Sequence, residues 1–78
     1  MSDTSLRVAA LIENEFGLYD LSPQQPIFSA GLLDSMDVLR LIVALEKNFS
    51  IKIPAFEVSL ETFDTLETIE NLLTSKLP

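Results

Sequence analysis

Apolar side chains recur three and four residues apart in three stretches of the chain, which is the spacing of one helix face. The first stretch predicts a helix over Thr4–Phe16, with Asp3 or Thr4 as its N-cap and Gly17 as its end. Its predicted apolar face consists of Val8, Leu11, Ile12 and Phe16.

The second stretch predicts a helix from Ser35 to Asn48, with Asp34 as its N-cap. One stripe on this helix is assigned to packing in the core, and it consists of Val38, Leu41, Ile42, Leu45 and Phe49. Met36, Leu39 and Val43 lie off that stripe, near Ser35 on the helix surface. They are either ordinary bundle residues or a partly exposed apolar patch that contacts partners.

The third stretch follows Asp64-Thr65-Leu66-Glu67, whose acid-x-x-Glu spacing predicts a capping box that opens the last helix. The apolar face of that helix is Leu66, Ile69, Leu72 and Leu73. A short helix is expected around Phe56–Glu61. The segment Ile51–Pro54 should be extended, because the residue before a proline avoids the helical region, but a lone strand has nothing to pair with.

A long connection, Leu18–Asp34, separates the first two helices and is interrupted by Pro23 and Pro26. Loops of this length in compact domains are usually functional. Its apolar residues should tie it to the core, and these are Ile27, Phe28, Leu32 and Leu33. The chain is therefore predicted to be one all-α domain, residues 1–78, a bundle of three main helices plus one short helix.

The composition excludes several kinds of chemistry. The chain has 78 residues with no cysteine and no histidine. Disulfides, thiolate metal sites and imidazole catalysis are therefore excluded, and a chain this short disfavours an enzyme built on carboxylates alone. The hydrophobic content of 47% argues against disorder.

The net charge of −7 comes from twelve acidic and five basic residues. Nucleic acids and anionic membranes call for clusters of Lys and Arg, so both are disfavoured as partners. The acidic balance would steer in partners with basic patches, or it only keeps the protein soluble. No apolar run is long enough to span a bilayer and no signal peptide opens the chain, so the cytoplasm is expected unless a removed signal directs it to an organelle.

Ser35 stands where loop passes into helix, in Gly31-Leu32-Leu33-Asp34-Ser35-Met36-Asp37. Backbone N–H groups at a helix start have no intrahelical partner, and the helix dipole there favours an anion such as a phosphate ester. The chain holds no group of its own to activate this hydroxyl. Ser35 is thus predicted to be modified by another enzyme, the alternative being an ordinary polar residue at a helix start.

The run from Asp34 to Phe49, followed by Ile51-Lys52-Ile53-Pro54, closely resembles the acyl carrier proteins, including the peptidyl, aminoacyl and D-alanyl carriers. The resemblance extends into Phe63-Asp64-Thr65-Leu66, the entry into the last helix. The first helix and the long loop agree in length and pattern rather than in motif. The stretch from Gly31 to Pro54 carries the specific part of the match.

This resemblance implies that Ser35 carries 4′-phosphopantetheine through a phosphodiester. A phosphopantetheinyl transferase would add it from coenzyme A with magnesium, helped by the acid at Asp34. The thiol of the arm would hold an acyl or aminoacyl cargo as a thioester, and a monomeric carrier would deliver it between enzymes of fatty acid, polyketide or nonribosomal peptide biosynthesis. Those enzymes would be activating ligases and downstream acyltransferases or synthases, and they would contact Met36, Asp37, Leu39, Arg40 and Val43.

Two features depart from the fatty-acid carriers. Arg40 and Lys47 interrupt the acidic face of the second helix, which disfavours docking to a basic partner surface. The turn from Gly31 to Ser35 is one residue longer than in those carriers and resembles stand-alone carriers such as the D-alanyl carriers. We therefore expect a discrete carrier of a specialised pathway, loaded by an acyl- or aminoacyl-adenylating ligase.

A hypothesis from another class is an unmodified helical module whose second helix binds a partner helix or groove. For such a module Ser35→Ala would leave function intact, whereas a charge at Leu39 or Val43 would abolish it. A calcium-binding helical protein is excluded because no Asp-x-Asp-x-Asp-Gly loop is present. A hydrolase built on Ser35 would lack a base.

Overall fold

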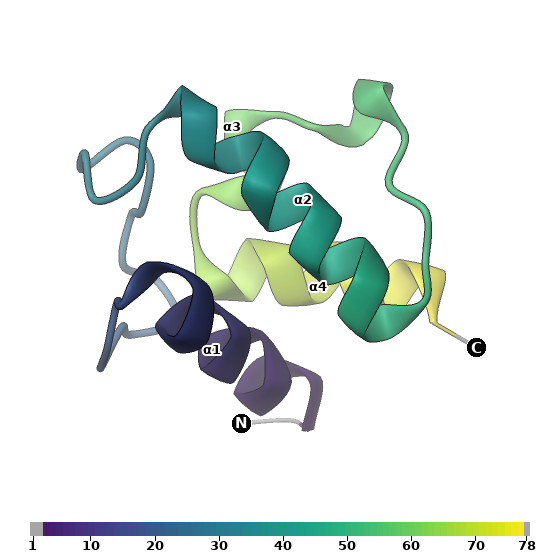
Figure 1. Ribbon diagram of the computed structural model, residues 1–78, viewed down its shortest axis with the longest axis horizontal. Coiled ribbons are helices and arrows are strands. Elements are labelled where there is room, and N and C mark those ends of the chain that lie inside the picture. Colours follow the sequence, from purple (N-terminus) through teal and green to yellow (C-terminus); the bar gives the residue numbers. More distant parts are fainter. Residues whose placement is uncertain (1–2, 78) are drawn as a thin grey trace.

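A computed structural model describes residues 3–77, and its regular elements are all helices (Figure 1). In chain order they are α1 (Asp3–Phe16), α2 (Ser35–Phe49), the 3-10 helix η1 (Ala55–Glu57), α3 (Leu60–Phe63) and α4 (Leu66–Lys76). Helix α4 packs against α1 and α3, and α1 also packs against α2. The predicted all-α bundle is confirmed. None of the helices in the described part of the chain has the length and apolar character needed to cross a membrane.

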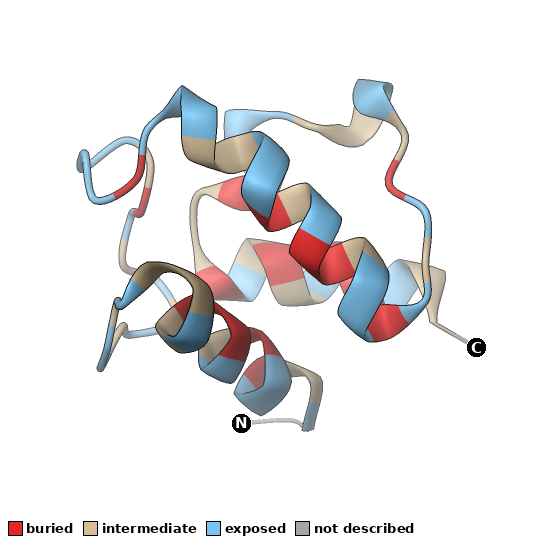
Figure 2. Cartoon of the chain, in the orientation of Figure 1, coloured by how far each residue is buried: buried red, intermediate tan, exposed pale blue. Residues whose placement is uncertain are grey.

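The helices meet around one apolar core, and Figure 2 places its residues on the sides of the helices that face one another. The face predicted for the last helix is confirmed in full, whereas Phe16 and Ile42 are only partly buried. Each fully buried aliphatic or aromatic side chain contributes about 1.5–3 kcal/mol, so these stripes hold the helices together. The buried apolar residues are Val8, Leu11, Ile12, Ile27, Leu33, Leu41, Ala44, Leu45, Phe49, Ile53, Phe63, Leu66, Ile69, Leu72 and Leu73.

Both long N-terminal helices end in left-handed backbone. Gly17 ends α1 as predicted, with a φ of 70° and an N–H that donates to the Glu13 carbonyl at 2.9 Å. Ser50 ends α2 with a φ of 54°, so α2 runs one residue further than predicted. The prediction of Asp3 or Thr4 as the N-cap of α1 is wrong, because both residues lie inside the helix and its cap falls outside the described residues.

The segment between α2 and α4 differs from the prediction. Residues 51–54 belong to no helix, and Pro54 has the predicted extended backbone, with a φ of −68° and a ψ of 152°. The Ile53 N–H donates to the Glu46 carboxylate at 2.8 Å. The prediction of a single short helix around Phe56–Glu61 is wrong, because the structure has two separate short elements there, η1 and α3. Val58 is extended, and the Ser59 hydroxyl caps α3 by accepting from the Thr62 N–H, so the helix starts afresh there.

The capping box of the last helix lies one residue later than predicted. Thr65 is the N-cap of α4, and its hydroxyl accepts from the Thr68 N–H at 3.1 Å. The Thr68 hydroxyl accepts in return from the Thr65 N–H at 3.2 Å. The box predicted from Asp64 and Glu67 is wrong, because the Asp64 carboxylate is engaged by the long loop instead.

That engagement, called the Asp64 clasp below, joins residues more than thirty positions apart. One carboxylate oxygen, Oδ1, accepts from the N–H groups of Ile27, Phe28 and Ser29 at 3.1, 2.7 and 2.9 Å. The other oxygen, Oδ2, accepts from the Ser29 hydroxyl at 2.6 Å. The Ser29 hydroxyl, followed by the loop N–H groups, lowers the pKa of the Asp64 carboxyl below its usual 3.8.

The long loop reaches the core through Ile27 and Leu33, which are both buried, and through the partly buried Phe28. The prediction that Leu32 does the same is wrong, since it is 43% exposed. The Ile27 carbonyl accepts from the N–H groups of both Leu32 and Leu33, at 2.9 and 3.2 Å. A turn this tight allows only one of the two leucines to point inward.

The clasp makes stability depend on pH with a definite sign. Because folding lowers the pKa of Asp64, its charged form stabilises the fold above about pH 3.8, and that contribution is lost as the pH falls through the lower folded value. Asp64→Asn should therefore lower the free energy of unfolding at pH 7 by about 1 kcal/mol or more, and the difference from wild type should shrink near pH 3. Urea unfolding at both pH values measures it.

Glu67 of α4 accepts from the Gln24 side-chain amide at 2.7 Å, and this contact to the same loop is present in wild type and in Asp64→Asn alike. Glu61→Gln serves as the charge control, because Glu61 is exposed on α3. An Asp64→Asn difference that stays the same at both pH values, or that Glu61→Gln reproduces, would contradict the assignment.

Candidate functional site

Ser35 is the first residue of α2 and is exposed. The predicted N-cap before it is confirmed: Asp34 Oδ1 accepts from the N–H groups of Met36 and Asp37 at 2.9 and 3.3 Å. Asp37 Oδ2 accepts in return from the Asp34 N–H at 3.1 Å. These reciprocal bonds fix where α2 begins and leave the Ser35 hydroxyl on the surface at the positive end of the helix dipole.

The turn before the helix depends on Gly31. Its φ of 80° lies in the left-handed region, which glycine adopts without strain. The Gly31 N–H donates to the Phe28 carbonyl at 3.1 Å. The turn sends Leu33 into the core, so the chain reaches Asp34 and Ser35 from a fixed point. The predicted backbone role of Gly31 is confirmed.

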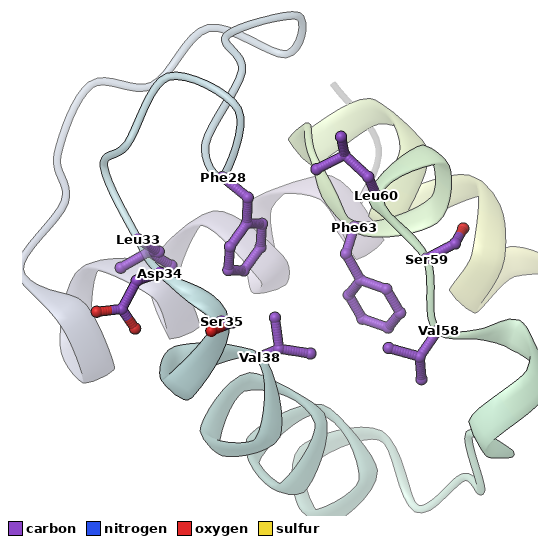
Figure 3. Close-up of a pocket in the computed structure, with 9 residues that line it drawn as sticks. All are labelled: Phe28, Leu33, Asp34, Ser35, Val38, Val58, Ser59, Leu60 and Phe63. Carbon is purple, nitrogen blue, oxygen red and sulfur yellow. The ribbon is translucent and has the colours of Figure 1, made fainter.

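Beside Ser35 lies a cavity of about 270 Å³ with mostly apolar walls (Figure 3). Figure 3 shows the aromatic rings of Phe28 and Phe63 and the branched side chain of Val38 converging on it from three segments. The prediction that Val38 serves packing only is wrong, because α2 turns it into this cavity rather than fully into the core. The lining residues are Phe28, Leu33, Asp34, Ser35, Val38, Val58, Ser59, Leu60 and Phe63.

The outer face of α2 carries the exposed apolar side chains. Met36, Leu39 and Val43 are 81, 69 and 54% exposed. They are therefore exposed rather than packed as ordinary bundle residues, and their contact with partners stays a prediction. With Arg40 of α2 and Glu15 of α1 they line a shallow groove distinct from the cavity that Ser35 lines. Asp37 lines neither and serves the capping box.

Arg40 is held by α1. Its guanidinium donates to the Glu15 carbonyl, lies 3.6 Å from a Glu15 carboxylate oxygen, and stacks over the Phe16 ring at 4.9 Å from the centroid. Arg7 makes a matching contact from α1 to α2, 4.2 Å over the Phe49 ring. The sequence identified Arg40 only as a positive charge on the docking face, and these contacts give it a second task in joining two helices.

A phosphopantetheine ester fits these residues. The serine oxygen is exposed, it stands at a capped helix start where negative charge is favoured, and an apolar cavity opens next to it. Sequence reasoning missed the cavity walls from the far segment, Val58, Ser59, Leu60 and Phe63. Helical periodicity describes one helix face at a time, so it gives no sign of a wall built from segments about 25 residues apart.

Comparison with known proteins agrees with this geometry. Residues 6–74 match the family described as "Phosphopantetheine attachment site". Aminoacyl carrier protein 1 of Bradyrhizobium diazoefficiens is 31% identical over 70 residues, which cover 90% of this chain and 77% of the relative. The D-alanyl carrier protein of Streptococcus sanguinis is 36% identical over 69 residues, 86% of each chain.

A solved structure is similar as well. It is the crystal structure of Bradyrhizobium japonicum glycine:[carrier protein] ligase complexed with its cognate carrier protein and an analogue of glycyl adenylate. The matched chain aligns with a TM-score of 0.66 and 30% identity, over 92% of this chain and 91% of that one. A second structure of that ligase, complexed with glycylated carrier protein, aligns with a TM-score of 0.64 and 32% identity.

The capping box can be tested by removing its first carboxylate. Asp34→Ala should lower the free energy of unfolding by about 1 kcal/mol, because two N–H groups at the start of α2 lose their acceptor. Asp34→Asn, which keeps an acceptor oxygen, should cost only part of that. Urea unfolding followed by circular dichroism measures both, and equal costs for the two variants would contradict the capping role.

Proposed function

The chain belongs to the family with a phosphopantetheine attachment site, and on that premise we propose that Ser35 is the attachment residue. The family makes the protein a carrier that uses 4′-phosphopantetheine as its cofactor and delivers aminoacyl groups or other acyl groups. The observation that carries the choice of residue is an exposed serine at a capped helix start beside an apolar cavity.

The attachment needs a partner enzyme. In the transfer from coenzyme A, the Ser35 oxygen bonds to the phosphorus that bears pantetheine, and the pyrophosphate bond of coenzyme A breaks. Adenosine 3′,5′-bisphosphate would leave, and the hydroxyl proton would pass to a base of the phosphopantetheinyl transferase. This chain has no histidine or cysteine, and the two carboxylates that flank Ser35 in sequence accept from N–H groups in the capping box. Asp34 supports the step from this side by holding the helix start rigid.

The attached group supplies the thiol that the polypeptide does not possess, and that thiol holds the cargo as a thioester. The chain itself supplies placement and recognition, so its role is delivery rather than catalysis. We expect it to act as a monomer in the cytoplasm, where coenzyme A and ATP are available to its partner enzymes.

The proposed cargo is an amino acid. Support comes from relatives named aminoacyl and D-alanyl carrier proteins, and from the glycine ligase structures that contain a similar chain. The partner would be a ligase that activates the amino acid as an adenylate and passes it to the carrier thiol with release of AMP. A downstream acyltransferase or synthase would then receive it.

The outer face of α2 is the proposed docking surface for these enzymes. It presents Met36, Leu39 and Val43 on the helix that begins with Ser35, with Arg40 among them. Exposed apolar side chains bordered by charges are typical of partner-binding sites. Because Arg40 is positive, the surface should favour partners whose docking face is not strongly basic.

The attachment residue can be tested by mass. Incubation of the protein with coenzyme A, magnesium and a broad-range transferase should add one phosphopantetheine to wild type and none to Ser35→Ala. Ser22→Ala is the matched control, since Ser22 is an exposed loop serine, and it should be modified like wild type. Unchanged mass for wild type, or addition to Ser35→Ala, would reject Ser35.

A further inference from the structure

We propose that Asp64 is a positioning residue for the modification of Ser35: the Asp64 clasp holds the loop that carries Asp34 and one wall of the cavity. This inference rests on the proposed attachment at Ser35. Asp64 lies in neither the cavity nor the capping box of α2, and it precedes the N-cap of α4.

The clasp is stronger than an ordinary loop contact. A single carboxylate oxygen accepts from three consecutive N–H groups, Ile27 to Ser29, at 2.7–3.1 Å. The Ser29 hydroxyl takes the second oxygen at 2.6 Å, and the Ile27 N–H also donates to the Asp64 backbone carbonyl at 2.7 Å. Hydrogen bonds to an ionised acceptor are about twice as strong as neutral ones. One side chain therefore fixes a whole turn of the loop.

A short, continuous path leads from this turn to Ser35. The Ile27 carbonyl accepts from the N–H groups of Leu32 and Leu33, which closes the loop back on the clasped residue. Leu33 is buried, and the next residue, Asp34, caps α2. The start of α2 is thus tied to Asp64 through backbone hydrogen bonds and one buried side chain.

The clasp also joins the two aromatic walls of the cavity. Phe28 donates its N–H to Asp64, and Phe63 directly precedes Asp64 in the chain. Figure 3 shows their rings on facing segments of the cavity beside Ser35. The carboxylate therefore sets the spacing of the two walls as well as the approach to the serine.

Glu61 and Glu67 are the acids closest to Asp64 in the chain, three positions away on either side, and Glu61 is exposed. The Glu67 carboxylate accepts from the Gln24 side-chain amide at 2.7 Å, and the Glu67 N–H donates to the Pro23 carbonyl at 3.1 Å. Within the described residues, every hydrogen bond to the Asp64 carboxylate comes from residues 27–29. Loss of the carboxylate should thus release this loop without redirecting another acid into its place.

The test follows the initial rate of phosphopantetheine addition, read by intact mass, at a temperature where circular dichroism shows every variant folded. Asp64→Ala should lower kcat roughly tenfold, since a misplaced reacting group costs this much or more. KM for the carrier should change by no more than about twofold, because the outer face of α2 is untouched. Asp64→Asn keeps an oxygen for the three N–H groups and should recover most of the rate.

Two controls separate positioning from general destabilisation. Glu61→Gln removes an exposed acid of α3 and should behave as wild type. The amide NMR signals of residues 27–29, and those of Met36 and Asp37, should shift in apo Asp64→Ala and stay in place in Glu61→Gln. If Asp64→Ala does not fold, Ser29→Ala decides, with an expected fall in kcat of about threefold from one lost hydrogen bond.

A folded Asp64→Ala with the kcat of wild type, or an equal loss in Glu61→Gln, would overturn the positioning role while leaving the attachment at Ser35 intact. An unchanged kcat in Ser29→Ala would do the same where Asp64→Ala is unfolded. Failure of wild type itself to gain the group would instead remove the attachment at Ser35, and the inference with it.

Discussion

The reciprocal hydrogen bonds between Asp34 and Asp37 are the constraint on which the site depends. They decide that α2 begins at Ser35 and not a turn earlier or later. If α2 began one residue later, Ser35 would itself stand at the N-cap, where a serine hydroxyl accepts from the N–H groups of the first turn. Because the box is satisfied by side chains on both sides of Ser35, the hydroxyl is not needed as a cap and stays available.

Around this start the molecule uses charge in two ways. Asp64 and Glu46 place their carboxylates against loop N–H groups, where each secures a segment without regular structure. Arg7 and Arg40 stack on aromatic rings across α1 and α2. A small domain has a modest core, and these polar contacts add to it at the loops and at the edges of the helices. The backbone around the start of α2 is thereby held in place, and Ser35 lies on that part of the surface.

The helices could be predicted from the sequence because their signals are local. Apolar spacing gave α1, α2 and α4, and the acid before Ser35 gave the cap of α2. Two of the errors share one cause, which is that the deciding contact comes from elsewhere in the chain. Asp64 has the right spacing to cap α4, yet the loop more than thirty residues away takes its carboxylate and leaves the cap to Thr65. Leu32 and Leu33 are equally apolar, and only the turn at Ile27 decides which is buried. The cavity beside Ser35 could not be predicted either, because its walls include both Phe28 and Phe63, and no local sequence pattern indicates that these two residues come together.

The central claim is that this chain carries its cargo on Ser35. The most direct measurement is the intact mass of the protein purified from its native host, followed by fragmentation to locate any added group. The account predicts phosphopantetheine on Ser35, with a further aminoacyl mass in the loaded fraction that hydroxylamine removes, as it does a thioester. A native protein without the group, or with it on another residue, would contradict the account.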